Sequence, residues 1–183
     1  MRGESHRRLG KYLVQRYMSN IPEACINAFL IGCIQPDRNP ATYLKGSFRE
    51  QWLRGHNYRN ARHFMRRISR RLEKKTKWTI FDYYTLGKLI HYTADAFTSA
   101  HNECFPTDLS VHQQYEHTLQ DYFLDYLRGE PAVNIRFAES VMDAIQIYHR
   151  EYRISCGDIH RDSSFALSAC CCILMILLTK PIL

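Results

Sequence analysis

The most constraining feature of this sequence is a series of histidine and acidic side chains at helical spacing in the middle of the chain. His91 precedes Asp95 by four residues, and His112 precedes Glu116 by the same interval. Residues four apart in an α-helix lie one above the other on one face, so each pair predicts a two-ligand clip. His101 falls between the pairs, just beyond the expected end of the first helix. The spacing therefore favours helices here and predicts that these side chains converge.

These side chains are of the kinds that bind a metal ion. Imidazole nitrogen and carboxylate oxygen are ligands of catalytic zinc sites, in which one coordination position stays open for water. A lone histidine on an amphipathic helix is more often a surface residue or a satisfied core residue, and one His-x-x-x-Glu pair would be weak evidence. Two pairs that flank a third histidine are much less expected by chance, so the sequence predicts a metal site.

Length and composition indicate one helical domain. The 183 residues are 45% hydrophobic and 13% aromatic, which is enough to bury one good core. The sequence contains no evident repeat, low-complexity tract or Gly/Ser linker, and no stretch alternates convincingly with the period of a strand. We therefore expect an all-α fold, a single-domain bundle of about seven helices over residues 1–183.

The formal net charge of +7 favours anionic partners, such as phosphate groups, nucleic acid or an acidic membrane surface. A strongly basic helix is expected at about residues 58–75. Its apolar stripe consists of Phe64, Ile68 and Leu72, so the helix should dock on the core with its basic side outward. A solvated face is the favoured interpretation of that side, and a dedicated binding surface is the alternative.

The cysteines do not suggest a disulfide framework, because their number is odd and three are consecutive. None has C-x-x-C spacing, so no metal is assigned to them. The N-terminus lacks the apolar core of a secretory signal, and we expect a cytoplasmic protein with reduced thiols, or a secreted one if a leader has been removed. The seven are Cys25, Cys33, Cys104, Cys156, Cys170, Cys171 and Cys172.

Breaks and caps predict the ends of the helices. Pro22 starts a helix that ends near Cys33, because Gly32 and Pro36 interrupt it. A capping-box-like start at Thr79 precedes the helix of the first clip. Other helices are expected at about residues 7–20, 108–128 and 134–154.

The last expected helix contains an apolar run at residues 165–178, after a cap at Asp158. The run is shorter than the roughly 18 to 20 apolar residues that a membrane span requires. A buried core helix is the favoured interpretation, and a tail anchor is the alternative. Upstream, Asp37 is expected in a loop between Pro36 and Pro40, where an aspartate is more often a turn residue or cap than a ligand.

Taken together, the motifs resemble the bacterial zinc-dependent phospholipase C family and, more distantly, the S1/P1-type zinc nucleases. The resemblance spans roughly residues 5 to 120. Its central motifs are Leu86-Gly87-x-x-x-His91-Tyr92-x-x-Asp95, His101 and His112-x-x-Tyr115-Glu116. Its upstream motifs, in the same order as in the family, are Ser5-His6-x-x-Leu9-Gly10, Gly32-x-x-x-Pro36-Asp37 and Gly55-His56.

The resemblance implies a set of zinc ligands, with two zinc ions expected and a third in question. One zinc would be surrounded by Asp37, His56, His91 and Asp95. A second would be held by His101, His112 and Glu116. His6 would join a third, with Asp95 as the bridging carboxylate. Secreted relatives complete that third site with a mature N-terminal tryptophan, whereas this sequence begins with Met1, so the third zinc is expected to be weak, ligated by Met1, or missing.

The resemblance also implies an activity in lipid metabolism. A phospholipase C-type phosphodiesterase would cleave a phospholipid to diacylglycerol and a phosphorylated head group, with Asp37 orienting or deprotonating the attacking water. Phospholipid or another phosphodiester would be the substrate, with peripheral contact to an anionic membrane surface. A zinc-dependent nuclease or nucleotidase is one alternative, which the compact spacing of His101 and His112 disfavours. A zinc-stabilised helical binding module without turnover is the other.

Overall fold

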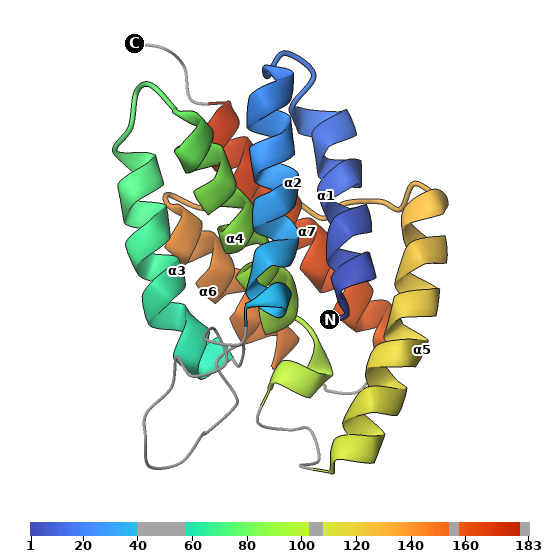
Figure 1. Ribbon diagram of the computed structural model, residues 1–183. Coiled ribbons are helices and arrows are strands. Elements are labelled where there is room, and N and C mark those ends of the chain that lie inside the picture. The colour runs from blue at the N-terminus through green and yellow to red at the C-terminus, as the bar shows by residue number, and fades with distance from the viewer. Residues whose placement is uncertain (40–57, 103–107, 154–157, 180–183) are drawn as a thin grey trace.

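The structure is a computed structural model that describes residues 1–39, 58–102, 108–153 and 158–179. Within these residues it contains α-helices, one 3-10 turn and no strand, which confirms the predicted all-α fold (Figure 1). The elements are α1 (Gly3–Tyr17), α2 (Glu23–Arg38), α3 (Tyr58–Glu73), α4 (Ile80–Ala96), η2 (Ser99–His101), α5 (Leu109–Arg128), α6 (Val141–Tyr152) and α7 (Ile159–Leu178).

Helix α4 is the central element of the bundle. It packs against α2, α3, α7 and α1, and from Leu86 onward every residue of the helix except Lys88 is buried. Figure 1 shows α3 and α5 at opposite sides of the bundle, with α2 and α4 between them. Because α4 is surrounded, any polar side chain in its second half must be satisfied by partners from the neighbouring helices.

Two glycines bring α2 and α4 into close contact. A methyl group added at Gly32 would lie 2.1 Å from the carbonyl oxygen of Tyr84, and one at Gly87 would lie 2.1 Å from that of Phe29. Only residues without a Cβ allow the two backbones to approach this closely. The contact fixes the register of the two helices, and His91 follows Gly87 by one helical turn.

Helix α2 is longer than predicted, because it continues through Pro36 to Arg38. Gly32 does not end the helix; it provides the contact with α4. Pro36 lies in the last turn, where its fixed φ is compatible with a helix and only one backbone hydrogen bond is lost. Asp37 therefore lies in the last turn of α2, and its prediction as a loop residue was wrong.

The prediction of a helix from residue 134 was also wrong, because α6 begins only at Val141. The Ser140 side chain caps it by accepting a hydrogen bond from the Asp143 backbone N–H. The Tyr148 hydroxyl donates to the carbonyl of Asn134 at 2.5 Å and accepts from the backbone N–H of Arg136 at 3.0 Å. These bonds hold the preceding segment outside the helix.

Helix α7 begins at the predicted cap, since the Asp158 side chain accepts hydrogen bonds from the backbone N–H groups of His160 and Arg161. Its 20 residues contain an 18-residue window with a mean hydropathy of 1.6, so by length and composition alone the helix could cross a membrane. Inside the fold, 67% of that window is buried. This burial supports the interpretation of α7 as a core helix.

Candidate metal centre

Three side chains from two helices form a buried cluster at the C-terminal end of α4. They are His6 of α1 and His91 and Asp95 of α4, here called the inner cluster, and their ligand atoms lie within 4.8 Å of one another. None of the three is more than 1% exposed. The predicted clip of His91 and Asp95 therefore faces the interior, where α1 adds a second imidazole.

Each oxygen of the Asp95 carboxylate faces one imidazole. Oδ1 lies 3.1 Å from His6 Nε2, and Oδ2 lies 3.2 Å from His91 Nε2. The two rings stack with their centroids 3.8 Å apart. Ligand atoms that are each about 2.0–2.1 Å from a tetrahedral zinc lie roughly 3.3 Å from one another. The spacing and the donor types of the inner cluster therefore fit zinc.

The orientation of His91 follows from the contact of α2 with α4. Its Nδ1 lies 2.9 Å from the carbonyl oxygen of Cys33, the residue after Gly32. A carbonyl can only accept, so Nδ1 donates to it, and Nε2 is the ring atom that lies on the side of the carboxylates. Metal-bound histidines commonly have such a backbone partner, which fixes the tautomer and the ring.

Asp37 lies at the edge of the inner cluster. Its Oδ1 is 3.6 Å from His91 Nε2, and its Oδ2 is 4.0 Å from His6 Nε2. The Asp37 side chain is 20% exposed, whereas that of Asp95 is fully buried. Asp37 is thus the carboxylate next to both imidazoles that also reaches solvent.

Three further side chains form a second set, here called the outer group. His101 lies on η2, and His112 and Glu116 lie on α5. His112 Nε2 is 3.5 Å from Glu116 Oε1, and the rings of His101 and His112 meet edge to face with centroids 5.9 Å apart. His101 Nδ1 lies 3.9 Å from Asp95 Oδ1, which places the outer group next to the inner cluster.

The α-amino group of Met1 lies where the two sets meet. Its nitrogen is 2.7 Å from Asp95 Oδ1 and 3.3 Å from Glu116 Oε1. Burial opposes the charged form, but Asp95, Glu116 and Asp37 together raise the pKa of this amino group to about 10. In this structure Met1 therefore contributes a positive charge between the carboxylates of the inner and outer sets.

The protonation states of the acidic ligands also suit a cation. Burial alone would raise the pKa of Asp95, yet His101 and the Met1 amino group are the main groups that hold it well below its usual value. Burial likewise opposes ionisation of Glu116, and the same amino group and His112 are among the groups that lower its pKa. Both carboxylates are therefore ionised, as metal binding requires.

His6 is in the form that binds a metal. Burial and the neighbouring His91 ring lower its pKa, so the ring is neutral. A neutral imidazole has a lone pair for a metal, whereas a protonated one has none.

A buried aspartate outside the predicted ligands holds the outer group in place. Asp162 Oδ2 accepts hydrogen bonds from the Ser99 backbone N–H at 2.9 Å, the Ser99 hydroxyl at 2.8 Å and the Tyr115 hydroxyl. Its Oδ1 accepts one from the Tyr152 hydroxyl at 2.7 Å. Asp162 thereby connects α7 to η2, which carries His101, and to the residue before Glu116.

Sequence reasoning missed Asp162 because an acidic residue in the first turn of a helix is common and favourable. The available signal was its place just ahead of the apolar stretch of α7, where a carboxylate must find donors if it is buried. Thr98 was missed as well. Its hydroxyl donates to the Asp95 carbonyl at 2.9 Å and lies 2.8 Å from His101 Nδ1, which can donate back to it.

The structure thus brings together every predicted ligand that it describes. These ligands are His6, Asp37, His91, Asp95, His101, His112 and Glu116. The remaining predicted ligand, His56, lies outside the described residues.

Comparison with known proteins gives the family. The sequence profile of the zinc-dependent phospholipase C family matches residues 5–165, a range that contains all of the ligands named above and Asp162. No curated protein and no solved structure matches the chain. The family implies a zinc cofactor, and the inner cluster supplies a site that could hold it. With this profile matching most of its length, the chain belongs to the zinc-dependent phospholipase C family.

Proposed function

We propose that this protein is a zinc-dependent phosphodiester hydrolase that cleaves the glycerol side of a phospholipid and releases diacylglycerol and a phosphorylated head group. Family membership supports the reaction type. The observation that carries the proposal is the position of Asp37, a partly exposed carboxylate beside the two buried imidazoles of the inner cluster. A water-activating group needs this combination of contact with the metal ligands and access to solvent.

We assign the roles of the site residues from the degree to which each side chain is buried. Bound zinc would lower the pKa of water and offset the negative charge that develops on the phosphoryl oxygens. Asp95 is fully buried with an imidazole at each oxygen, so we assign it to metal binding. Asp37 would orient the attacking water and accept its proton. The outer group is more open, with His112 32% exposed, and would face the incoming phosphodiester.

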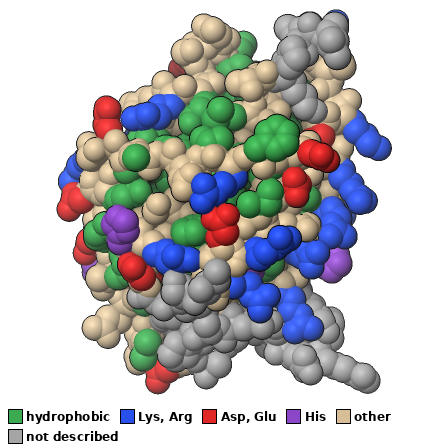
Figure 2. Space-filling model, turned by 180° about the vertical axis from the view of Figure 1, so that it is seen from behind, with side chains coloured by type: hydrophobic (Ala, Val, Ile, Leu, Met, Phe, Trp, Pro, Cys, Tyr) green, Lys and Arg blue, Asp and Glu red, His purple; other side chains and the backbone are tan. Residues whose placement is uncertain are grey.

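We also propose that the protein meets its substrate at an anionic membrane surface. Its net charge of +7 supports such contact. Figure 2 shows Lys and Arg side chains gathered towards one edge of the rear face. Positive charge would attract nucleic acid as well, so the preference for phospholipid as the substrate class rests on the family.

The proposal is tested by measuring zinc stoichiometry after reconstitution, together with hydrolysis of a chromogenic phosphocholine diester with and without chelator. We expect two or three zinc ions per chain and activity that chelator abolishes. Hydrolysis of nucleotide esters alone would replace the proposal with the nuclease alternative. One zinc without any turnover would indicate a binding module, and failure to bind zinc would overturn the metal centre itself.

The role of Asp37 is tested by Asp37→Asn. We expect kcat to fall by about 100-fold or more, the effect of losing a general base, while zinc content changes little. Asp121→Asn is the control, because Asp121 is 69% exposed on α5 and pairs only with His117 among the described residues. A parallel loss of zinc and activity in Asp37→Asn would make Asp37 a metal ligand without a separate catalytic role.

A further inference from the structure

A basic pocket lies between the start of α3 and the end of α6, apart from the residues of the metal centre. It has a volume of about 410 Å³ and is lined by Tyr58, Arg62, Gln146, His149, Arg150 and Arg153. Three of these six residues are arginines and none is acidic. We call it the arginine pocket.

Among the described residues, the arginines of this pocket have no acidic partner. In the part of the chain that the structure describes, none of Arg62, Arg150 and Arg153 pairs with a carboxylate. All three side chains are exposed at the pocket rim. Neighbouring guanidinium groups repel one another, so a bound anion would relieve that repulsion as well as form hydrogen bonds.

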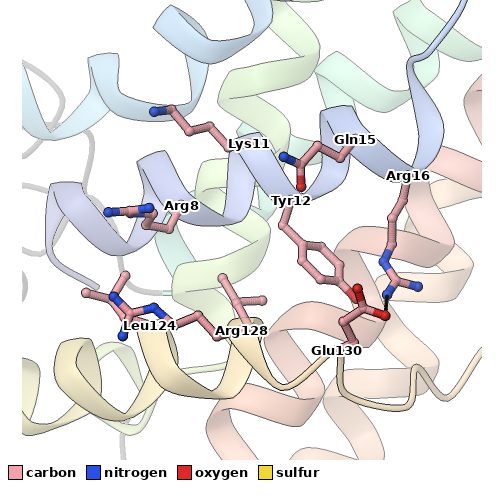
Figure 3. A pocket seen from close by; sticks show the side chains of 9 residues that line it. Arg8, Lys11, Tyr12, Gln15, Arg16, Leu124, Arg128 and Glu130 are labelled. Atoms are coloured by element: carbon pink, nitrogen blue, oxygen red, sulfur yellow. Dashed lines mark ion pairs between the residues drawn. The ribbon is translucent and has the colours of Figure 1, made fainter.

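A second basic groove differs from the arginine pocket because its basic side chains are paired with carboxylates. The groove between α1 and α5 has a volume of about 560 Å³ and contains four basic side chains (Figure 3). Most of them already have carboxylate partners, so the groove presents internal ion pairs to a ligand. The pairs are Arg16 with Glu130 at 3.5 Å, Arg8 with Glu4 at 3.1 Å and Arg128 with Asp125 at 2.6 Å.

Ring stacking and hydrogen bonds anchor Tyr58 and His149, which form the floor of the arginine pocket. The rings of Tyr58 and His149 stack with centroids 3.5 Å apart. His149 Nε2 lies 3.1 Å from Asn102 Oδ1, and Asn102 Nδ2 donates to the carbonyls of Ala96 and Thr98. These last two bonds fix the amide orientation, so Nε2 of His149 must be the donor to Oδ1. These contacts reduce the ordering that Tyr58 and His149 would undergo when a ligand binds.

His149 also reports on the charge in the pocket. Burial, with Arg153 and Arg62, lowers the pKa of His149 to about 4. The ring is therefore neutral near pH 7, and cations from both α3 and the end of α6 act on it. An anion that offsets those arginines must raise the pKa of His149.

We propose that the arginine pocket is a binding site for a phosphate monoester dianion. Guanidinium groups bind phosphate oxygens through paired N–H donors, and three of them suit the double charge of a monoester better than the single charge of a diester. The phosphorylated head group that a phospholipase C releases belongs to this class, as do inorganic phosphate and the head group of phosphatidic acid. The site stands on its own residues, whether or not the metal centre hydrolyses phosphodiesters.

The test is a titration of the zinc-loaded protein with inorganic phosphate at constant ionic strength, followed by NMR of the histidine side chains. We expect a saturable shift of the His149 resonances and a rise in the pKa of His149. Phosphate that binds at the metal centre would instead shift His101 and His112, so the two sites are distinguished in one experiment. Absence of a saturable response at His149 would overturn the proposal.

Matched variants assign the binding to the pocket. Arg153→Gln and Arg150→Gln should each weaken phosphate binding at His149 by tenfold or more. Arg70→Gln removes the same charge from the exposed side of α3, two turns beyond Arg62, and should change the affinity less than twofold. Equal weakening of phosphate binding by Arg70→Gln would mean that the response reflects the overall positive charge of the protein. That result would refute a specific site in the pocket.

Vesicles identify the source of the phosphate. Sedimentation with phosphatidylcholine vesicles that contain phosphatidic acid is compared with phosphatidylglycerol vesicles of equal surface charge. Preference for phosphatidic acid that Arg153→Gln abolishes would assign the pocket to a lipid head group. Equal binding to both vesicle types, together with the phosphate response at His149, would assign it to a soluble phosphate ester.

Discussion

The two halves of the candidate metal centre are held in place by different means. The inner cluster lies on long, closely packed helices, and its side chains are at most 1% exposed. The outer group lies on a three-residue 3-10 turn and on the first turns of α5, and its side chains are 13% to 32% exposed. Helix packing and the bond from His91 to the Cys33 backbone position the first set, whereas the second depends on side-chain hydrogen bonds from α7 and Thr98.

This difference separates the roles that the two halves can have. The inner cluster combines a fixed tautomer, full burial and a rigid backbone contact, which favour tight and specific metal binding. The outer group is more open to solvent and its support is more local, so it can be weakened without disturbing the core. Substitutions in the supports should therefore affect the two halves unequally.

The largest effect is expected from Gly87→Ala. The new methyl group would lie 2.1 Å from the Phe29 carbonyl oxygen and 2.8 Å from the Cys33 backbone nitrogen, so α2 must move away from α4. Overpacking against backbone should lower the free energy of unfolding by about 3 kcal/mol. Because the Cys33 contact with His91 would also be lost, the inner cluster should lose its zinc. Urea unfolding and zinc analysis measure these effects.

Gly10→Ala provides the control for that substitution. The nearest atom to its new methyl group is Leu30 Cδ2 at 3.1 Å, the end of a side chain that can rotate. The gain in helix propensity offsets the crowding, so the free energy of unfolding should stay within about 1 kcal/mol of wild type. Wild-type zinc content in Gly87→Ala would show that the helix contact does not hold the inner cluster.

A smaller and more selective effect is expected from Asp162→Asn. Asparagine cannot accept all the hydrogen bonds that Asp162 receives from Ser99, Tyr115 and Tyr152. Buried donors left without an acceptor should cost about 2 kcal/mol of stability. Zinc held by the outer group (the outer zinc) should be lost, while zinc held by the inner cluster (the inner zinc) should be retained. Elemental analysis and chelator competition measure both.

Asp158→Ala separates this positioning role from stability alone. Asp158 caps the same helix, and its loss should cost about 1 kcal/mol, but it contacts neither half of the metal centre. Zinc content should stay at the wild-type level. If Asp162→Asn also kept all of its zinc, Asp162 would be a structural residue without influence on the outer group.

Thr98→Val tests a single contact between the two halves. Valine keeps the shape of threonine but removes the oxygen that lies between the Asp95 carbonyl and His101 Nδ1. Loss of such a partner of a metal-bound histidine typically weakens metal affinity by about 10- to 100-fold. We expect this loss for the outer zinc alone, in a competitive titration with a zinc chelator. Equal weakening at both sites would show that the halves do not act separately.

The sequence predicted the inner cluster better than its supports, and the reason is geometric. The spacing of His91 and Asp95 on a helix is a local property, so the pattern alone places them on one face. The all-α fold followed from similar local signals, and both the fold and the family are confirmed. His6 and Asp37 came from the family resemblance, which assigned His6 to a third zinc, and the prolines beside Asp37 suggested a loop.

The supports could not be predicted because they depend on tertiary contacts. The contact between Asp162 and Ser99 depends on the packing of α7 against α4 and α6. No local sequence pattern predicts it. The same reason explains the wrong helix start at residue 134, where bonds from Tyr148 and Ser168 overcome the local helical preference. The Met1 amino group was named for the third zinc site through the resemblance, and its contacts with Asp95 and Glu116 came from the fold.

The smallest effect is expected at the opposite end of α4, where Asp82 accepts hydrogen bonds from Lys75 at 2.6 Å and from the Thr79 backbone N–H at 2.9 Å. Burial opposes its ionisation, but these bonds lower the pKa of Asp82 to about 2, from 3.8. A carboxyl group with a lowered pKa stabilises the folded state fully above its unfolded pKa and loses this effect as the pH falls through its folded pKa. The stabilisation from Asp82 is therefore lost as the pH falls from about 4 to about 2.

Asp82→Asn should lower the free energy of unfolding at pH 7 by about 1 kcal/mol, because partial exposure of Lys75 and Arg71 weakens the ion pairs. Urea unfolding at pH 7 and pH 2, with chelator in both samples, should show this deficit at pH 7 and little of it at pH 2. Zinc content at pH 7 should be unchanged, since Gly87 and the inner cluster lie further along the helix. Loss of zinc would mean that the inner cluster depends on the stability of all of α4. The inner cluster and the outer group would then differ only in how strongly they depend on their supports.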